Sequence, residues 1–188
     1  MPNVLCHRKK NLSAFRKIAL GTWQTEYDPS IYGTMTLKMD QSLEYIRKFR
    51  EKTGKKLTVT HLVTKAVALA LKACPDANAI LRFNQIYLRE SIDLCVLVVM
   101  EENGQIDLSA AKLMRVDTLT LSDMVDQLDE HVKRIRARKD RALEQTRQSM
   151  KRMPAILMNA LMKLLSFLMY ALNLDLSFAG LPKDAFGS

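Results

Sequence analysis

The sequence predicts an α+β fold, or a mixed α/β sandwich, in which helices cover a sheet. Residues 32–39 alternate between polar and apolar side chains, which is typical of a half-buried strand. Residues 92–100 are almost continuously apolar and rich in valine, which indicates a strand buried on both faces inside a sheet. Between them, residues 58–73 carry alanine, leucine and valine around most of a helical circumference, so we expect a helix buried on more than one side.

Capping residues set the boundaries of the first two helices. Asp40 offers an N-cap for a helix that ends at Gly54, where a left-handed residue is easily accommodated. Either Thr58 or Thr60 can cap the second helix, and Pro75 ends it because proline cannot continue the helical hydrogen bonds. The sequence thus predicts two consecutive helices after the alternating strand.

The remaining elements follow from turn and capping signals. Two short strands, Ile80–Phe83 and Ile86–Leu88, are expected to form a hairpin that turns at Asn84. Thr120 followed by Asp123 resembles a capping box, which predicts the start of a long helix.

At 188 residues the chain is long enough for one domain with a sizeable core, and its composition, 48% hydrophobic and 26% charged, is that of a folded protein. We expect an N-terminal arm over residues 1–14 and the domain over residues 15–188. Three widely spaced cysteines without a CxxC pair indicate reduced thiols in a cytoplasmic protein, and no metal site is expected.

The net charge of +9 is concentrated in residues 133–152, which hold nine basic and two acidic residues. Such a surface can attract cofactor phosphates, nucleic acid or an anionic membrane, or it can be a solvated helix face. Nucleic acid is not expected, because the cluster lacks interleaved aromatic residues. The candidates for phosphate binding are Arg134, Arg138 and Arg141.

An apolar helical segment is expected over residues 153–181. Its most apolar part, residues 153–174, is long enough to span a bilayer but contains Lys163, which makes insertion marginal. A helix buried in the domain or in an oligomer contact is the first interpretation, and weak attachment to a membrane surface is the alternative.

Residues 57–100 resemble the catalytic domain of the dihydrolipoyl acyltransferases, the core subunits of 2-oxo-acid dehydrogenase complexes. The family's helix motif is reproduced by residues 65–71, its proline-to-asparagine-alanine step by residues 75–79, and its buried strand by residues 93–99. The resemblance extends over about residues 15–145. It implies a chloramphenicol acetyltransferase-like fold, a two-layer sandwich whose mixed sheet is covered by helices.

The strand departs from the family pattern at two positions. Cys95 stands where the family has glycine, and Leu97 stands where it has alanine. Both side chains are larger, so a substrate channel along this strand would be narrower or differently shaped. The resemblance therefore makes Asp93, Cys95 and Leu97 the candidates for the channel wall.

The resemblance implies acyl transfer between coenzyme A and a thiol such as dihydrolipoamide, with a histidine in a His-x-x-x-Asp-Gly motif as general base. A base with a pKa near 6.5 can remove the proton of a thiol whose pKa is near 8.5 as the thiol attacks. None of the three histidines, His7, His61 and His131, is followed by Asp-Gly at that spacing, so no catalytic residue is assigned. We expect His61 to be a neutral histidine of the core or of the helix cap.

The last four residues resemble the beginning of the family strand that stabilises the oxyanion, so the C-terminal third of the domain is expected to be missing. The first hypothesis is therefore an acyltransferase-type domain, inactive alone, that uses coenzyme A as a substrate and an acyl thioester. A partner can carry the lipoyl group, and the resemblance implies a trimer-based homo-oligomer. The second hypothesis is a non-catalytic scaffold, or a membrane-surface protein that uses the basic helix and residues 153–174.

Overall fold

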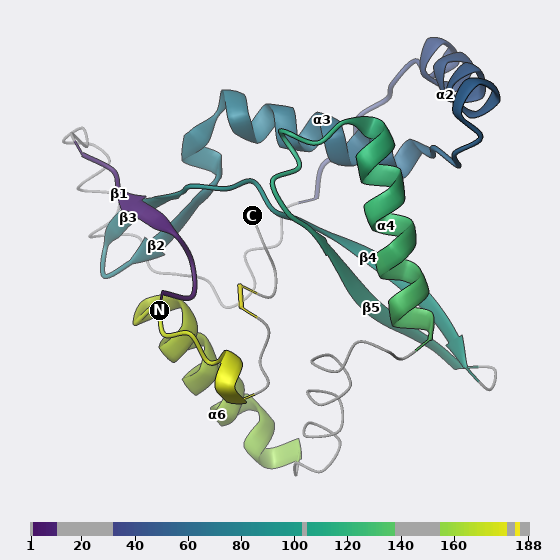
Figure 1. Cartoon of the computed structure of the whole chain (residues 1–188). Helices are drawn as coiled ribbons and strands as arrows, with labels where there is room; N and C mark the ends of the chain where they lie inside the picture. Colours follow the sequence, from purple (N-terminus) through teal and green to yellow (C-terminus); the bar gives the residue numbers. More distant parts are fainter. Residues whose placement is uncertain (1, 11–31, 103–104, 138–154, 180–182, 185–188) are drawn as a thin grey trace.

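The structure is a computed structural model that describes residues 2–10, 32–102, 105–137, 155–179 and 183–184. Helices and antiparallel strands alternate along this part of the chain (Figure 1). In chain order the elements are β1 (Cys6–Arg8), α2 (Asp40–Thr53), α3 (Val59–Ala73), η1 (Pro75–Ala77), β2 (Ala79–Arg82), β3 (Gln85–Arg89), β4 (Leu94–Glu102), β5 (Gln105–Leu113), α4 (Leu121–Arg136), α6 (Ala155–Ser166), the π-helical turn η2 (Phe167–Ala171) and η3 (Ser177–Ala179).

The described strands form two separate antiparallel sheets, where a single mixed sheet was predicted. One sheet has the order β1-β3-β2, and the other is the hairpin β4-β5. The predicted hairpin at Asn84 is confirmed: Phe83 and Asn84 have φ values of 47° and 59°, the left-handed pair that a tight two-residue turn requires.

The main core lies between one face of the β4–β5 hairpin and helices α3 and α4. Helix α4 lies against the hairpin (Figure 1) and packs mainly on β5. The buried residues of this core include Ala68, Leu94, Val98, Leu113 and Met124. A smaller core, formed by Ile46, Leu57 and Val125, attaches α2 to the start of α3 and to α4.

Most of the predicted helix caps are confirmed. Gly54 ends α2 in the left-handed conformation with φ 68°, and Thr58 begins α3 in a capping box with His61. Thr120 begins α4, where its hydroxyl accepts the backbone N–H of Asp123. The prediction for Asp40 was wrong by one position: Met39 occupies the N-cap, and Asp40 lies in the first turn, where its charge still favours the helix dipole.

The strand predicted over residues 32–39 is not formed. Residues 32–38 lie outside any helix or strand and are exposed; Tyr32 is 94% exposed and Met35 is 82% exposed. An alternating pattern reports which side chains could share a face, but a strand also needs a neighbour to pair with. No described strand pairs with this segment.

Helix α3 and strand β4 are less buried than predicted. In α3 only His61, Thr64 and Ala68 are buried, whereas Val63 and Leu69 are about half exposed. In β4 one face is buried, and the other exposes Leu97 and Val99. Both elements therefore pack on one side within the described part of the molecule.

Within the expected N-terminal arm, residues 2–10 pack onto the domain, because β1 pairs with β3 and places His7 opposite Leu88. Asn3 is buried and donates to the carbonyl of Met169 at 3.0 Å, while Asn173 accepts the N–H of Val4 at 2.8 Å. The predicted boundary near residue 14 lies outside the described residues and stays a prediction.

Within the apolar segment, helix α6 is followed directly by η2, so residues 155–171 are helical, whereas residues 172–176 lie outside any helix. Residues 153–154 and 180–181 of the expected helical segment lie outside the described residues. Among the described helices, none combines the length and the apolar character needed to cross a membrane.

Candidate functional site

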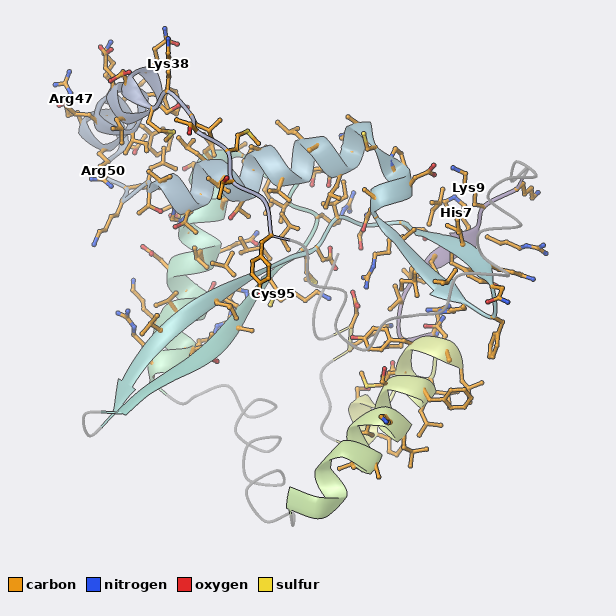
Figure 2. All side chains as sticks on the ribbon, turned by 180° about the vertical axis from the view of Figure 1, so that it is seen from behind. His7, Lys9, Lys38, Arg47, Arg50 and Cys95 are labelled. Carbon is orange, nitrogen blue, oxygen red and sulfur yellow. The ribbon has the colours of Figure 1, made fainter. Side chains whose placement is uncertain are left out.

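The outer face of the β4–β5 hairpin, defined as the face turned away from α4, carries the predicted channel residues. Register pairs Cys95 with Lys112 and Leu97 with Ala110, and alternation places all four side chains on this face. Figure 2, the view from behind, labels Cys95 on the side of the hairpin opposite to α4. The outer face is exposed toward the hairpin tip, where Leu97 is 66% exposed.

A partly buried cluster of charges lies at the foot of this outer face. Lys112 extends its ammonium group between two carboxylates: Nζ lies 3.4 Å from Asp93 Oδ2 and 3.2 Å from Asp184 Oδ2. It also donates to the carbonyl oxygen of Asp184 at 2.7 Å. Arg89 of β3 completes the cluster through Asp184 Oδ2 at 2.7 Å. The cluster thus joins both sheets and the turn at residues 183–184.

Contacts of different kinds hold Asp93 in place. Besides the ion pair with Lys112, its Oδ1 accepts the backbone N–H of Arg115 at 2.9 Å. Asp93 is buried, and a buried carboxylate needs such partners because desolvation penalises its charge. The residue therefore anchors the start of β4 to the end of β5.

The structure brings the three channel candidates together on one face but gives them different surroundings. Asp93 lies in the charged cluster, Cys95 is half-buried opposite Lys112, and Leu97 is exposed. Burial raises the pKa of the Cys95 thiol, and the nearby Lys112 charge opposes that shift. A thiol with a raised pKa is a poor nucleophile at neutral pH, so Cys95 fits a wall better than an attacking group.

Of the three phosphate-binding candidates, Arg134 alone lies within the described residues. Arg134 is exposed on α4 and pairs with Glu130 one turn earlier, at 3.2 Å. Arg138 and Arg141 lie outside the described residues. Their role in phosphate binding stays a prediction.

His61 is a capping and core histidine, as expected from the sequence. It is 4% exposed, and its Nδ1 accepts the backbone N–H of Thr58 at 3.2 Å. Burial lowers the pKa of its imidazole, an effect that Asp129 partly opposes. The ring is therefore neutral at pH 7 and engaged in helix capping.

Three residues of the charged cluster were missed by the sequence analysis: Arg89, Lys112 and Asp184. They lie on β3, on β5 and near the C-terminus. Because they are far apart in the sequence, no local pattern predicts that their side chains are in contact. The available signal was a lysine between two apolar residues, Ala111 and Leu113, which are buried on the opposite face of β5.

Two hollows flank these elements. One, of about 360 Å³, lies at the foot of the outer face beside the charged cluster and is lined by Asp93, Lys112 and Asp184 among others. The other, of about 560 Å³, lies between α2 and the start of α3. Its arginines have internal partners: Arg47 pairs with Glu51 at 3.2 Å, and Arg50 Nε donates to the Leu57 carbonyl at 2.8 Å. We therefore place the candidate site on the outer face.

Comparison with solved structures gives likenesses over about half of the chain. A probable dihydrolipoamide acetyltransferase from Listeria monocytogenes is 21% identical, with a TM-score of 0.46, over 52% of this chain and 42% of that chain. A dihydrolipoamide acetyltransferase from Azotobacter vinelandii is 29% identical, with a TM-score of 0.44, over 52% of this chain and 41% of that chain.

A curated relative aligns over a longer part of the sequence. It is the dihydrolipoyllysine-residue acetyltransferase component of the acetoin cleaving system of Bacillus subtilis (strain 168), 29% identical over 131 residues. The alignment covers 66% of this chain and 32% of the relative, so the matched part spans about a third of the relative's length.

The sequence profile described as 2-oxoacid dehydrogenases acyltransferase (catalytic domain) matches residues 8–151. The match includes α2, α3, both hairpins and α4, and thus the whole described outer face. It spans well over half of the sequence. The chain therefore belongs to the family of the 2-oxoacid dehydrogenase acyltransferase catalytic domain.

Proposed function

We propose that this chain forms one wall of an acyl-transfer site that moves an acyl group between coenzyme A and a thiol such as dihydrolipoamide. The observation that carries the proposal is the outer face of β4, which lies inside the family match and is apolar yet exposed at Leu97 and Val99. Exposed apolar strands of this kind are unfavourable in water unless another surface covers them. An acyl chain and a covering polypeptide would bury this face.

The general base of this reaction is proposed to come from outside these 188 residues. His61 is engaged in helix capping, and the pKa of Cys95 is raised, so neither is suited to deprotonate a thiol. The His-x-x-x-Asp-Gly motif of the family would supply the missing base. We also propose that a polypeptide carrying this motif completes a chloramphenicol acetyltransferase-like sandwich with this chain. The complete protein would be a trimer-based homo-oligomer in the cytoplasm, and a partner would carry the lipoyl group.

The test is an assay of acetyl transfer from acetyl-coenzyme A to dihydrolipoamide. We expect no transfer by the chain alone, and transfer when it is mixed with a separately produced polypeptide that carries the family's His-x-x-x-Asp-Gly motif. Leu97→Asp should abolish the activity of the mixture. Leu164→Asp should not, because Leu164, at 54% exposure, is on α6 and away from the outer face. Transfer by the chain alone, or equal effects of the two variants, would refute the proposal.

A second candidate function is attachment to a membrane surface. It is favoured by the exposed apolar side chains around α6, where Leu164, Phe167 and Phe178 are 54%, 49% and 86% exposed. Such side chains, in a chain whose sequence also holds the basic residues of 133–152, would suit an interface of anionic lipid. The check is pelleting with phosphatidylserine vesicles at low and high salt: salt-sensitive pelleting supports attachment, and no pelleting in either condition rules it out.

A further inference from the structure

Cys6 lies on the same face of the sheet β1-β3-β2 as several arginines. Register places Cys6 of β1 opposite Arg89 of β3, and it places Arg82 of β2 opposite Gln85 of β3. Paired residues, and residues two positions apart on one strand, share a face of a sheet. The face that carries Cys6, Arg8, Arg82 and Arg89, named here the arginine face, therefore combines a thiol with side chains that carry guanidinium groups.

Arg82 is buried although the groups around its guanidinium are neutral. The residue is 7% exposed. Its Nη2 donates to Asn173 Oδ1 at 3.1 Å, and its Cζ lies 5.4 Å from the centroid of the Tyr87 ring. Its Nε is buried and has no hydrogen-bond partner among the described residues. A buried cation is fully compensated only by a group that carries negative charge, so Arg82 is suited to hold an anion.

The same guanidinium is directed at the sulfur atom of Cys6. Arg82 Nη1 donates to Cys6 Sγ at 3.4 Å, and Cys6 is a free, partly exposed cysteine. Arg89, which lies opposite Cys6, already has a carboxylate partner in Asp184 at 2.7 Å. Cysteines that are partly exposed and lie beside a cation are the ones that oxidants modify selectively. The contact therefore joins a buried cation to an atom that can acquire negative charge.

The other two cysteines have different surroundings. Cys95 lies opposite Lys112, whose ammonium is already shared by the carboxylates of Asp93 and Asp184. Cys74 is exposed at the C-cap of α3. Within the described part of the chain, Cys6 alone is hydrogen-bonded to a buried guanidinium. Cys74 and Cys95 therefore provide internal references for the reactivity of Cys6.

We propose that Cys6 is a modification site at which a hydroperoxide, such as hydrogen peroxide, oxidises the thiol to a sulfenic acid. The sulfur attacks one peroxide oxygen, so an S–O bond forms as the O–O bond breaks. The sulfur loses two electrons, the peroxide is reduced to water, and the thiol proton ends on the leaving hydroxide. Arg82 Nη1 stabilises the negative charge on the sulfur during the attack and then donates to the new oxygen. Cys6 precedes residues 8–151, which match the family, so this site lies beyond the proposed function.

The experiment treats the full chain with hydrogen peroxide in the presence of dimedone, which traps sulfenic acids. Peptide mass spectrometry then gives the labelling rate of each cysteine in the same sample. A hydrogen bond from a charged donor corresponds to about a tenfold change in rate, so Cys6 should be labelled about tenfold faster than Cys74 and Cys95. Labelling of Cys6 no faster than that of the exposed Cys74 would overturn the proposal, and this comparison needs no variant.

Arg82→Gln removes the charge beside the sulfur and should slow the labelling of Cys6 about tenfold, with the rate at Cys74 unchanged. The matched control is Arg8→Gln, an exposed arginine of the arginine face, which should change the rate at Cys6 by no more than about twofold because solvent screens its charge. Circular dichroism verifies that both variants are folded. Equal effects of the two variants at Cys6, or no effect of Arg82→Gln, would also overturn the proposal. The readout is modification of sulfur, so its outcome is independent of acyl transfer and of the proposed function.

Discussion

The two faces of the β4–β5 hairpin differ in what covers them, although the same two strands build both. The inner face, against α3 and α4, buries Leu94, Val98 and Leu113, each less than a tenth exposed. The outer face leaves Leu97 and Val99 more than half exposed. The strand β4 is about equally apolar on both faces, so the comparison separates residues whose burial stabilises this domain from residues that the described part of the chain leaves exposed.

Truncating the inner face should give the largest effect. Leu113→Ala removes a fully buried side chain from the main core and leaves a cavity against α4. We expect the free energy of unfolding to fall by about 3 kcal/mol, measured by urea denaturation. A loss below about 1 kcal/mol would mean that the inner face does not carry the stability of the hairpin.

Lys65 of α3 stabilises the packing of α3 on the inner face through hydrogen bonds to the turn between β5 and α4. Its ammonium group donates to the carbonyl oxygens of Val116, Asp117 and Leu119 at 2.9, 2.8 and 2.7 Å, in the turn that leads from β5 to α4. Lys65→Met keeps the length of the side chain but leaves three carbonyls without this donor. We expect a loss of about 2 kcal/mol in urea denaturation; an unchanged unfolding free energy would refute this role.

The pH dependence of the free energy of unfolding tests His61, which is buried in the first turn of α3. Burial lowers its folded-state pKa below the ordinary value of 6.5. As pH falls through 6.5 toward the folded pKa, the unfolded chain binds more protons than the native chain, so stability decreases; above that range the group has no effect. His61→Asn should reduce the loss of unfolding free energy between pH 7 and 5. Identical slopes for the two proteins would contradict this assignment.

Truncating the outer face should give the smallest effect. Leu97→Ala removes a side chain that is 66% exposed, so the unfolding free energy should change by no more than about 0.5 kcal/mol. The same urea titration used for Leu113→Ala provides the comparison. A loss as large as that of Leu113→Ala would show that the outer face is already covered.

Local signals in the sequence predicted the helices and the first hairpin well. Gly54, Thr58, Asn84 and Thr120 act through their own backbone geometry or a neighbour's, so their positions could be inferred without the fold. The family resemblance, confirmed by the profile match, rested on motifs in the same part of the chain. These features depend on interactions over a few residues.

Burial and the charged cluster could not be predicted in the same way. Periodicity shows that residues 32–39 and both faces of β4 are suited to burial, but not which partner buries them. The cluster of Arg89, Lys112 and Asp184 depends on contacts between residues up to 95 positions apart. Only the three-dimensional arrangement brings such groups together, so the candidate site was located only in part, at Asp93, Cys95 and Leu97.

The most direct test of the account is whether the outer face is covered by the polypeptide that carries the general base. Alkylation of Cys95, half-buried on that face, can be followed by mass spectrometry, with the exposed Cys74 as an internal control. We expect the added polypeptide to slow the alkylation of Cys95 severalfold and to leave the alkylation rate of Cys74 unchanged. Equal rates at Cys95 with and without the polypeptide would contradict it.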